Sequence, residues 1–494
     1  MRRIGFDNSK YIKLQSQNIL ERISQFGGKL YLEFGGKLFD DFHASRVLPG
    51  FEPDSKVRML SEMKDEAEII VVISADDIER SKRRGDLGIT YDLDVFRLIE
   101  AFRDSGLYVG SVVITRYRDQ NAAKIFAKKL DSLGITYYKH YEIQDYPANL
   151  PLIVSADGFG KNEYIQTSRQ LIVVTSSGPG SGKMATCLSQ LYHEYKLGNL
   201  AGYAKFETFP IWNLPLQHPV NVAYESATSD LADMNMIDHF HLEAYGERTV
   251  NYNRDIEIFP VVSAILSRIL GESPYKSPTD MGVNMAGFCI TDDDAVQDAA
   301  KQEVIRRFYA TAREARRGTA EPVEVQRQEL LMNQLNVSPA DRPVVAAALK
   351  RSAETCDTAV ALELPDGLIV TGKTSELLGA ASACLLNALK ALAGIDNEVL
   401  LISPEVIEPI QQLKVTHMGN RNPRLHTDEL LIALAISAVS DNKSALAIAQ
   451  LENLAYCEAH STVILTSVDE NVFQRLKVNM TYEPKFQAQK LYQK

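Results

Sequence analysis

Two hydrophobic rhythms alternate along the first half of the chain. Short apolar runs typical of buried strands are separated by longer segments whose apolar residues recur at the spacing of a helix face. The predicted strands cover residues 30–34, 68–74, 108–115, 136–140, 150–155, 171–175 and 202–207, and the predicted helices cover residues 10–25, 91–104, 121–133 and 184–196. Apolar strands joined by helices are typical of an α/β fold, with a mainly parallel sheet that is covered by helices on both faces.

This rhythm changes near residue 249. The next predicted helices cover residues 259–270, 295–317 and 323–334, without a predicted strand between them. Strands then return at residues 359–364, 368–371, 398–403 and 462–466, among predicted helices at residues 344–353, 377–392, 427–439 and 445–455. We therefore predict an α/β domain over residues 1–248, a helical middle domain over 249–340 and a smaller C-terminal α/β domain over 341–494.

A glycine-rich turn joins the predicted strand 171–175 to the helix that follows it. Its candidate binding residues are Ser177, Gly178, Gly180, Ser181, Gly182 and Lys183. Glycines let successive backbone N–H groups point at one anion, while the start of the helix and the lysine add positive charge. This P-loop-like arrangement predicts binding of a phosphorylated small molecule, such as ATP or another nucleotide. The alternative is a strand-to-helix turn that binds no ligand.

The turn departs from the P-loop pattern at two positions. Ser177 stands where the first glycine is expected, and Met184 follows the lysine where Ser or Thr normally binds Mg²⁺. A thioether does not supply the hard oxygen that Mg²⁺ prefers. Ser181, Thr186 or a distant carboxylate would have to replace it, so the sequence leaves open whether Mg²⁺ takes part.

A second string fits the P-loop expression letter for letter. It runs from Gly367 through Leu-Ile-Val-Thr to Gly372, Lys373 and Thr374. The four intervening residues favour strands, and Pro365-Asp366-Gly367 is typical of a hairpin turn. An extended strand cannot wrap a phosphate, so we predict a hairpin there, with Thr374 or Ser375 capping the next helix.

Other residues are candidates for chemistry outside the glycine turn. Asp238, His239, His241 and Glu243 form a cluster in which both imidazoles would share one face of a strand, but not of a helix. A histidine pair without a metal is the alternative, and we predict no metal site. Lys183, Asp238 and His241 are the candidate catalytic residues. A density of ionisable groups near a glycine pair predicts a pocket wall that contains Glu33, Lys37, Asp40, Asp41 and His43.

Composition narrows the class of protein. A net charge of −11 argues against a dedicated nucleic-acid binder. The five cysteines include no C-x-x-C pair, which favours a reducing cytoplasm. The N-terminus lacks the apolar run of a secretion signal, and no uncharged apolar stretch is long enough to span a membrane. We expect a cytoplasmic protein with no membrane and no nucleic-acid partner, and self-association into a homo-oligomer is compatible with the sequence.

Three long strings resemble a known bacterial family. They are residues 31–43 (YLEFGGKLFDDFH), residues 177–193 (SGPGSGKMATCLSQLYH) and residues 236–245 (MIDHFHLEAY). The chain is similar over its whole length to uncharacterised protein family 0371, a domain-of-unknown-function family. The resemblance implies an α/β N-terminal part, a helical part and a C-terminal α/β domain, but no activity. It also implies that Gly-Ser-Gly-Lys-Met is the family's loop, which argues against ordinary Mg-ATP chemistry.

Two classes of function follow from these features. The first is an enzyme of phosphoryl transfer or hydrolysis, in which Lys183 and the loop amides stabilise phosphate charge. The second is a non-catalytic sensor or assembly protein that responds to a nucleotide or metabolite.

Overall fold

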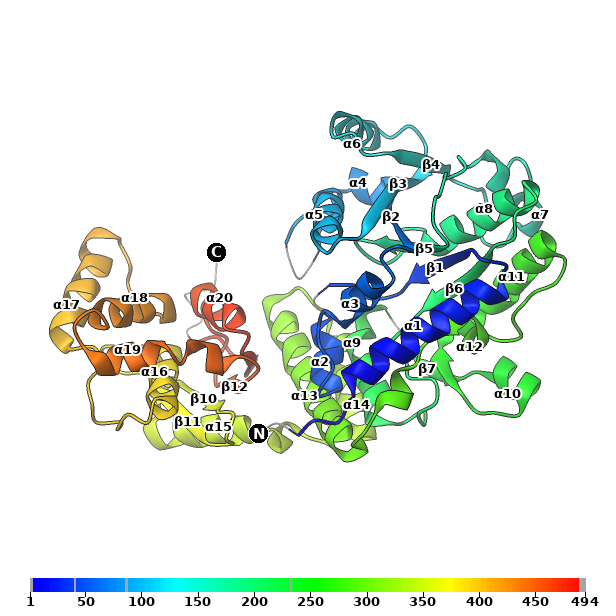
Figure 1. Cartoon of the computed structure of the whole chain (residues 1–494). Coiled ribbons are helices and arrows are strands. Elements are labelled where there is room, and N and C mark those ends of the chain that lie inside the picture. Colours follow the sequence, from blue (N-terminus) through cyan, green and yellow to red (C-terminus); the bar gives the residue numbers. More distant parts are fainter. Residues whose placement is uncertain (1–2, 40, 85–87, 232, 488–494) are drawn as a thin grey trace. The chain divides into compact units, whose positions relative to one another are not determined.

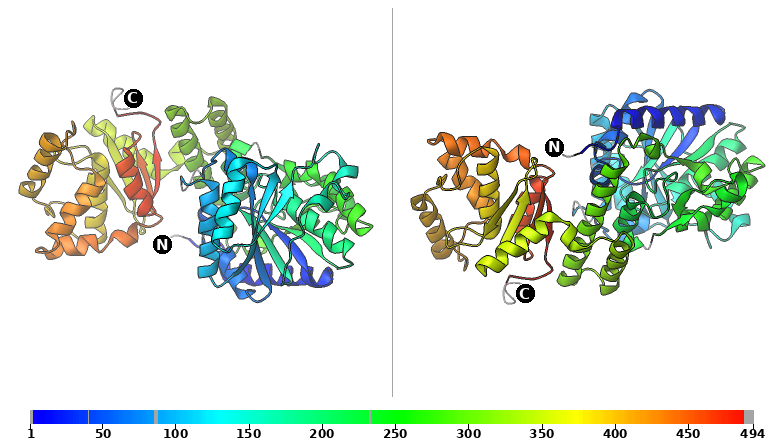
Figure 2. Two further views of the ribbon diagram at one scale, coloured as in Figure 1. Left: turned by 90° about the horizontal axis from the view of Figure 1, so that it is seen from above. Right: turned by 90° about the horizontal axis from the view of Figure 1, so that it is seen from below.

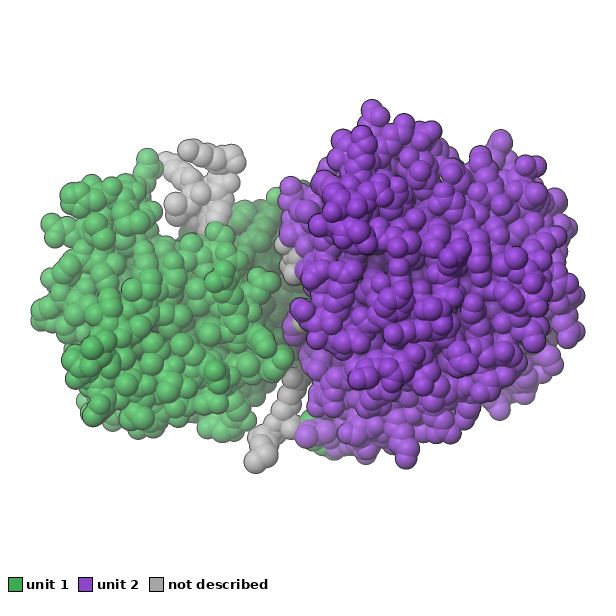
Figure 3. Space-filling model, turned by 45° about the horizontal axis from the view of Figure 1, so that its top comes forward, with its two compact units in different colours: residues 1–3, 301–494 green, residues 4–300 purple. Residues whose placement is uncertain are grey.

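The chain forms two compact units. The computed structural model describes residues 3–39, 41–84, 88–231 and 233–487 (Figure 1). One unit is Ile4–Ala300, and the other is Lys301–Lys494 together with Met1–Arg3 (Figure 3). The division into three domains therefore stays a prediction. Among the described residues, no helix combines the length and the apolar content that crossing a bilayer requires.

A seven-stranded sheet forms the centre of the unit Ile4–Ala300. Its strands lie in the order β4-β3-β2-β5-β1-β6-β9, and every neighbouring pair is parallel. They are β1 (Leu30–Phe34), β2 (Ala67–Ser74), β3 (Tyr108–Tyr117), β4 (Tyr137–Tyr141), β5 (Leu171–Ser176), β6 (Gly202–Phe206) and β9 (Gly282–Val283). A separate antiparallel pair joins β7 (Asn235–Ile237) to β8 (Val250–Tyr252). The predicted α/β fold with a mainly parallel sheet is confirmed.

Helices cover both faces of this sheet (Figure 2). On one face, Tyr31 of β1 and Tyr203 of β6 lie in a core with α8 and α11. Alternate residues of a strand point to opposite faces, so Phe34 and Phe206 stack on each other on the other face. Lys56 of α3 lies over the ring of Phe206 on that face. The strands are apolar on both faces because each face is buried.

The long helices predicted in this unit are present, among shorter helices that the hydrophobic pattern did not predict. The main ones are α1 (Asn8–Gln25), α2 (Phe42–Val47), α3 (Ser55–Glu62), α4 (Ala75–Glu79), α5 (Tyr91–Asp104), α6 (Asn121–Ser132), α8 (Lys183–Lys196), α9 (Pro219–Ala227), α10 (His239–Tyr245), α11 (Asn253–Leu270) and α12 (Pro278–Met281). The long helix α13 (Asp293–Arg317) runs from this unit into the next.

The unit that contains Lys301–Lys494 is built around a smaller mixed sheet. Its strands lie in the order β11-β10-β12-β13, and only the pair β12–β13 is parallel. They are β10 (Ala359–Glu363), β11 (Ile369–Lys373), β12 (Glu458–Ser461) and β13 (Asn479–Tyr482). The helices are α14 (Pro322–Gln334), α15 (Pro343–Thr355), α16 (Ala380–Leu392), α17 (Pro404–Gln412), α18 (Thr427–Ser437), α19 (Asn442–Ile448) and α20 (Ser467–Arg475).

Three predicted strands are wrong. Residues 150–155 contain the short helix α7 (Leu150–Ile153), because Asn149 caps its start and Pro151 suits the first turn of a helix. Residues 398–403 contain no strand; Leu401 and Ile402 are buried without a ladder partner. Residues 462–466 lie just beyond β12, and only Ile464 makes an isolated bridge there. A short apolar run records burial but does not show whether the backbone pairs with a neighbouring strand.

The helix predicted at residues 377–392 begins later than expected. Its first residue is Ala380, its N-cap is Gly379, and neither Thr374 nor Ser375 caps it. The Ser375 hydroxyl instead accepts a hydrogen bond from the Leu378 N–H at 3.0 Å within the preceding turn.

The strand order of the large sheet has a switch point between β2 and β5. From β2 the chain continues to β3 on one side, whereas from β5 it continues past β1 to β6 on the other side. β2 and β5 are neighbours, so the two connections diverge from their carboxyl ends. Ligands of open parallel sheets bind in the crevice that such divergence leaves. The glycine turn begins at the end of β5 and therefore lies at this point.

Candidate functional site

The glycine turn bends sharply between β5 and α8. Gly180 has a φ of 74° and Gly182, the residue before α8, has a φ of 96°. This left-handed region is open to glycine but costly for residues with a Cβ. A Cβ on Gly180 would meet no heavy atom within 4 Å, so this part of the turn faces open space.

Two neighbouring elements hold the turn in place. The Thr115 hydroxyl, on β3, donates a hydrogen bond of 2.6 Å to the Ser181 carbonyl. The Ser177 hydroxyl donates to the Tyr91 carbonyl at 3.2 Å. A Cβ on Gly178 would lie 2.3 Å from the Tyr91 hydroxyl oxygen, so that position requires glycine. The turn is thus supported from the side of β3 and α5.

Most backbone N–H groups of the turn have no acceptor among the described residues. Within the described residues, no hydrogen bond is donated by the N–H groups of Gly178, Gly180, Ser181, Gly182 or Lys183. The Ser181 hydroxyl is buried, and no described residue hydrogen-bonds to it. Unpaired buried polar groups are unfavourable unless a ligand or water satisfies them. The turn therefore offers several donors to an anion.

Lys183 adds a cation at the same place. Its Nζ donates to the Ser176 hydroxyl at 3.4 Å, and no carboxylate of the described chain lies within ion-pair distance. Burial lowers the pKa of Lys183; the negative charge of Glu33 opposes this effect and the positive charge of Lys205 adds to it. The charged side chains that act on Lys183 thus belong to β1 and β6, which follow β5 in the order of the sheet.

A cluster of charged residues lies beyond Lys183 at the end of β6. The Lys205 Nζ is 2.7 Å from the Glu207 Oε1 and also contacts the Asp255 Oδ2, at the start of α11. Burial alone would lower the pKa of Lys205, but Asp255 and Glu207 outweigh it and raise this pKa. Burial raises the pKa of Glu207 and the charge of Asp255 adds to this, although Lys205 opposes it. The Lys205 ammonium group thus forms ion pairs with both the Glu207 and the Asp255 carboxylates.

Glu33 is the carboxylate of this region that is not paired with a cation. It lies on β1 opposite Val174 of β5 and Lys205 of β6. Its Oε2 accepts a hydrogen bond of 2.8 Å from the Tyr203 hydroxyl, and its exposed fraction is 9%. No described residue donates a hydrogen bond to its Oε1. Of the pocket wall predicted around residues 31–43, this residue faces the glycine turn.

Other residues of that predicted wall make structural contacts elsewhere in the unit. Asp41 caps α2 and forms an ion pair of 2.7 Å with the buried Lys56. Burial would raise the pKa of Asp41, but Lys56 outweighs this effect and lowers it. The His43 ring packs against Phe209 and Tyr224. Asp40 lies outside the described residues.

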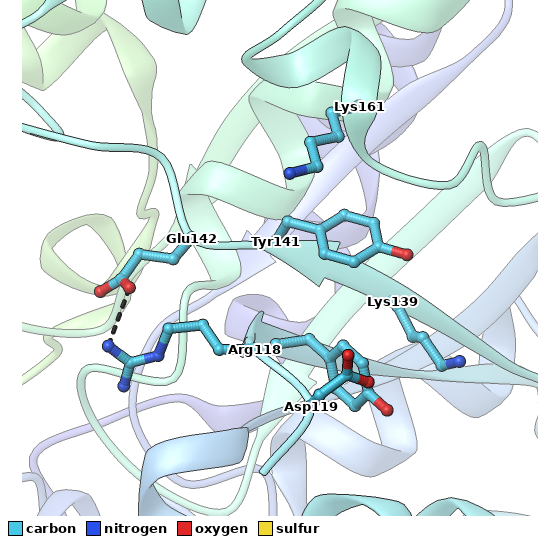
Figure 4. A pocket seen from close by; sticks show the side chains of 7 residues that line it. Arg118, Asp119, Lys139, Tyr141, Glu142 and Lys161 are labelled. Atoms are coloured by element: carbon cyan, nitrogen blue, oxygen red, sulfur yellow. Dashed lines mark hydrogen bonds and ion pairs between the residues drawn. The ribbon is translucent and has the colours of Figure 1, made fainter.

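A pocket of about 440 Å³ opens at the carboxyl ends of β3 and β4 (Figure 4). Its lining consists of Tyr117, Arg118, Asp119, Lys139, Tyr141, Glu142 and Lys161. Arg118 pairs with Glu142 at 2.8 Å and with Asp76 at 2.6 Å. Lys161 lies over the ring of Tyr141 and Lys139 over that of Tyr117. Three cations therefore surround an open pocket on the same edge of the sheet as the glycine turn.

A second pocket of about 430 Å³ continues from the first. Glu142 lines both, and the second is completed by Ile143, Gln144, Asp145 and Tyr146. The Tyr146 hydroxyl is buried without a hydrogen-bond partner among the described residues. Burial raises the pKa of Tyr146, and the charge of Glu33 adds to this increase, so the two side chains are within electrostatic reach. Tyr146 therefore lines this pocket and also lies within the electrostatic influence of Glu33.

The structure does not bring Asp238 and His241 to the glycine turn. Asp238 is the N-cap of α10 and accepts hydrogen bonds from the His241 N–H and from the Thr279 N–H and hydroxyl. The His241 Nδ1 lies 2.8 Å from the Ser277 hydroxyl. These bonds join α10 to α12. A catalytic role for either residue stays a prediction, and their contacts are those of a helix cap.

The two histidines of the cluster lie on a helix. His239 and His241 both belong to α10, so they do not share the face that a strand would have offered. Across the described ranges, no group of three or more His, Cys, Asp or Glu residues is arranged to hold a metal ion. Ser277, which bonds to His241, is the N-cap of α12, and α12 leads directly into the edge strand β9.

The second P-loop-like string forms a hairpin, as predicted. β10 and β11 pair antiparallel, and Gly367 lies in the turn between them with a φ of 87°. A Cβ on Gly372 would lie 2.1 Å from the backbone nitrogen of Cys384, so this glycine allows α16 to approach the strand. The hairpin turn thus accounts for Gly367, and the packing of α16 accounts for Gly372.

Sequence reasoning missed several residues of this region. Thr115 and Tyr91 support the turn from elements far away in the sequence, which no local pattern indicates. Lys205 and Glu207 did leave a signal, because two charges alternate at the end of an apolar strand. Asp255 left none, since acidic residues are common in the first turn of a helix.

The hydrogen bond from Thr115 should position the turn for its ligand. We expect Thr115→Val to weaken inorganic phosphate binding about fivefold and to destabilise the unit by roughly 1 kcal/mol, because the Ser181 carbonyl loses its donor. Calorimetric titration and urea unfolding measure the two effects. The matched control is Thr228→Val, which removes a hydroxyl bond to the Tyr224 carbonyl in α9. It should lower stability but leave binding unchanged; equal binding losses in both variants would contradict the prediction.

Two family models together cover most of the chain. The model described as Domain of unknown function DUF1846, N-terminal, matches residues 4–336, and the C-terminal DUF1846 model matches residues 340–492. A UPF0371 protein of Streptococcus thermophilus (strain CNRZ 1066) is 58% identical over 494 residues, which is 100% of each chain. A UPF0371 protein of Streptococcus pneumoniae (strain Hungary19A-6) is 57% identical over the same length and coverage.

Proposed function

This chain belongs to the UPF0371 family, with its N- and C-terminal DUF1846 domains, and we propose that it binds a phosphorylated small molecule at residues 177–183. The observation that carries the proposal is the set of turn N–H groups that donate to no described residue, beside the ammonium of Lys183, which forms no ion pair with a described carboxylate. Convergent amides and a lysine at the start of a helix are the groups that bind phosphate oxygens. A nucleotide or a phosphorylated metabolite fits this chemistry.

A reaction at the bound phosphate would use the same groups. Lys183 and the turn amides would stabilise negative charge as a phosphoryl group is transferred or hydrolysed. Met184 supplies no hard oxygen for Mg²⁺, so the negative charge of the phosphate would be neutralised mainly by Lys183. The free cysteines agree with a cytoplasmic setting for this activity.

Binding can be tested by adding inorganic phosphate and pyrophosphate to the purified full-length protein. Each should raise the melting temperature, because a ligand of the native state stabilises it. Lys183→Ala should weaken binding by roughly 10- to 100-fold, since a hydrogen bond from a charged donor contributes about 1.5–3 kcal/mol. Titration calorimetry measures the affinity of each variant.

The second P-loop-like string offers the matched control. Lys373→Ala alters the lysine of the better-matching sequence, which lies in β11, and should leave binding unchanged. If neither anion shifts the melting temperature, or if both lysine variants bind as wild type does, the turn is not a phosphate site. Binding without release of product from ATP or pyrophosphate would point to the sensor function and not to catalysis.

A further inference from the structure

Glu33 is placed to receive a donor from a bound ligand. Its Oε2 is occupied by the Tyr203 hydroxyl, whereas no described residue donates to its Oε1. Val174, its partner on β5, comes two residues before the last residue of that strand. Neighbouring strands are about 4.8 Å apart and rise about 3.3 Å per residue, so the base of the turn lies roughly 8 Å from Glu33. A phosphorylated molecule of several carbons spans that distance.

Tyr146 provides a second free hydrogen-bonding group on the same side. Its hydroxyl is buried without a partner in the part of the chain that the structure describes, and the charge of Glu33 acts on it. A phenol hydroxyl donates one hydrogen bond and accepts others, whereas a carboxylate only accepts. A ligand hydroxyl can satisfy both, because it also donates and accepts.

The pocket beside Tyr146 has the composition of a hydroxyl-binding site. Glu142, Gln144 and Asp145 supply polar side chains, and only Ile143 is aliphatic. A nucleobase would need a more apolar wall, since small-molecule pockets for aromatic groups are lined mainly by apolar side chains. A cationic ligand is disfavoured near Glu33, because Lys183 and Lys205 act on the same region.

We propose that the ligand is a phosphorylated sugar or polyol, whose phosphate lies on residues 177–183 and whose hydroxyl groups bind Glu33 and Tyr146. This inference rests on the proposed function and names its substrate class. The buried Tyr146 hydroxyl, which has no partner among the described residues, and the Glu33 Oε1, to which no described residue donates, carry it, together with the polar pocket that Tyr146 lines. It also agrees with Met184, because a sugar phosphate does not need the Mg²⁺ contact that a nucleotide triphosphate normally uses.

The test compares four probes on the full-length protein by titration calorimetry. They are inorganic phosphate, glycerol 3-phosphate, glucose 6-phosphate and ATP with Mg²⁺. At least one of the two hydroxylated phosphates should bind ten times or more tightly than inorganic phosphate, and more tightly than Mg-ATP. Glu33→Gln and Tyr146→Phe should each remove most of that tenfold excess. Tyr146→Phe should change the affinity for inorganic phosphate by less than twofold, and Glu33→Gln should not weaken it, because that change removes a negative charge that acts on Lys183.

A matched control is Tyr108→Phe, at the start of β3 and thus at the amino edge of the sheet. It should leave the affinity for all four probes unchanged. If inorganic phosphate does not bind, the proposed function itself fails. If phosphate binds but neither hydroxylated phosphate binds more tightly, or if Mg-ATP is preferred, the substrate class is overturned. The substrate class is also overturned if both Glu33→Gln and Tyr146→Phe keep the full tenfold preference for the hydroxylated phosphate. Two variants are used so that the test still stands if one of them does not fold.

Discussion

Replacing Lys205 by methionine is expected to destabilise the unit Ile4–Ala300 by about 3–5 kcal/mol at neutral pH. The substitution keeps an unbranched side chain that lacks only the terminal ammonium, and it leaves Glu207 and Asp255 close together without their cation. Breaking a buried ion pair by removing one partner typically costs this much, because the remaining charge stays buried and uncompensated. Urea unfolding, with hydrogen exchange followed in peptides from β1, β5 and β6, measures the loss within this unit.

The penalty of Lys205→Met should depend on pH. Burial and the charge of Asp255 already raise the pKa of Glu207. Without Lys205, Glu207 gains further from binding a proton, so the variant should lose less stability at pH 5 than at pH 8. Lys128→Met on the exposed face of α6 is the control and should change stability by less than about 0.5 kcal/mol. A Lys205→Met penalty that is small, or the same at both pH values, would contradict the paired-charge interpretation.

Replacing Arg342 by methionine should destabilise the unit that contains Lys301–Lys494 by a similar amount, about 3–5 kcal/mol. The Arg342 side chain is fully buried and donates to the Glu458 carboxylate at 2.6 Å and to the carbonyls of Ala459 and Asn479. It therefore links β12 to β13. Hydrogen exchange in peptides from these two strands during urea unfolding provides the measurement.

The partner carboxylate adds a pH dependence to this prediction. Burial alone would raise the pKa of Glu458, but Arg306 and Arg342 outweigh it and lower the pKa to about 2. A carboxyl group with a lowered pKa stabilises the fold above its unfolded pKa, so this contribution, roughly 3 kcal/mol, is lost as the pH falls from about 4.5 toward 2. Arg342→Met should make that loss smaller. Arg351→Met, which removes an exposed pair with Glu354, should leave both stability and its pH dependence unchanged.

Much of the large sheet could be predicted because its buried strands are visible in the sequence as apolar runs. Residues 30–34 form β1 as predicted, and residues 91–104 form α5, since apolar runs and helical spacing were both long and regular there. The prediction failed at residues 398–403, where buried leucine and isoleucine side chains pack without strand pairing. Hydrophobic periodicity records which side chains leave water, not which backbone groups find partners.

The candidate site also contains one part that the sequence indicated and one part where residue type was a poor guide to the contacts. The turn was visible because glycines, a lysine and a helix start are adjacent in the sequence. Asp238 and His241 were named because their residue types suit catalysis, yet their hydrogen bonds are those of a cap between α10 and α12. Residue type alone does not distinguish a capping carboxylate from a reacting one, because both accept hydrogen bonds.

The sequence by itself determined the family, the α/β class and the glycine turn between a strand and a helix. Each of these depends on a pattern of residues that are close together in the sequence or that recurs along it. Only the tertiary structure decided which residues surround that turn. Thr115, Glu33 and Lys205 come from separate strands that the parallel sheet brings to the turn. Strand order sets that gathering, and strand order follows from the packing of the whole sheet and not from any one segment.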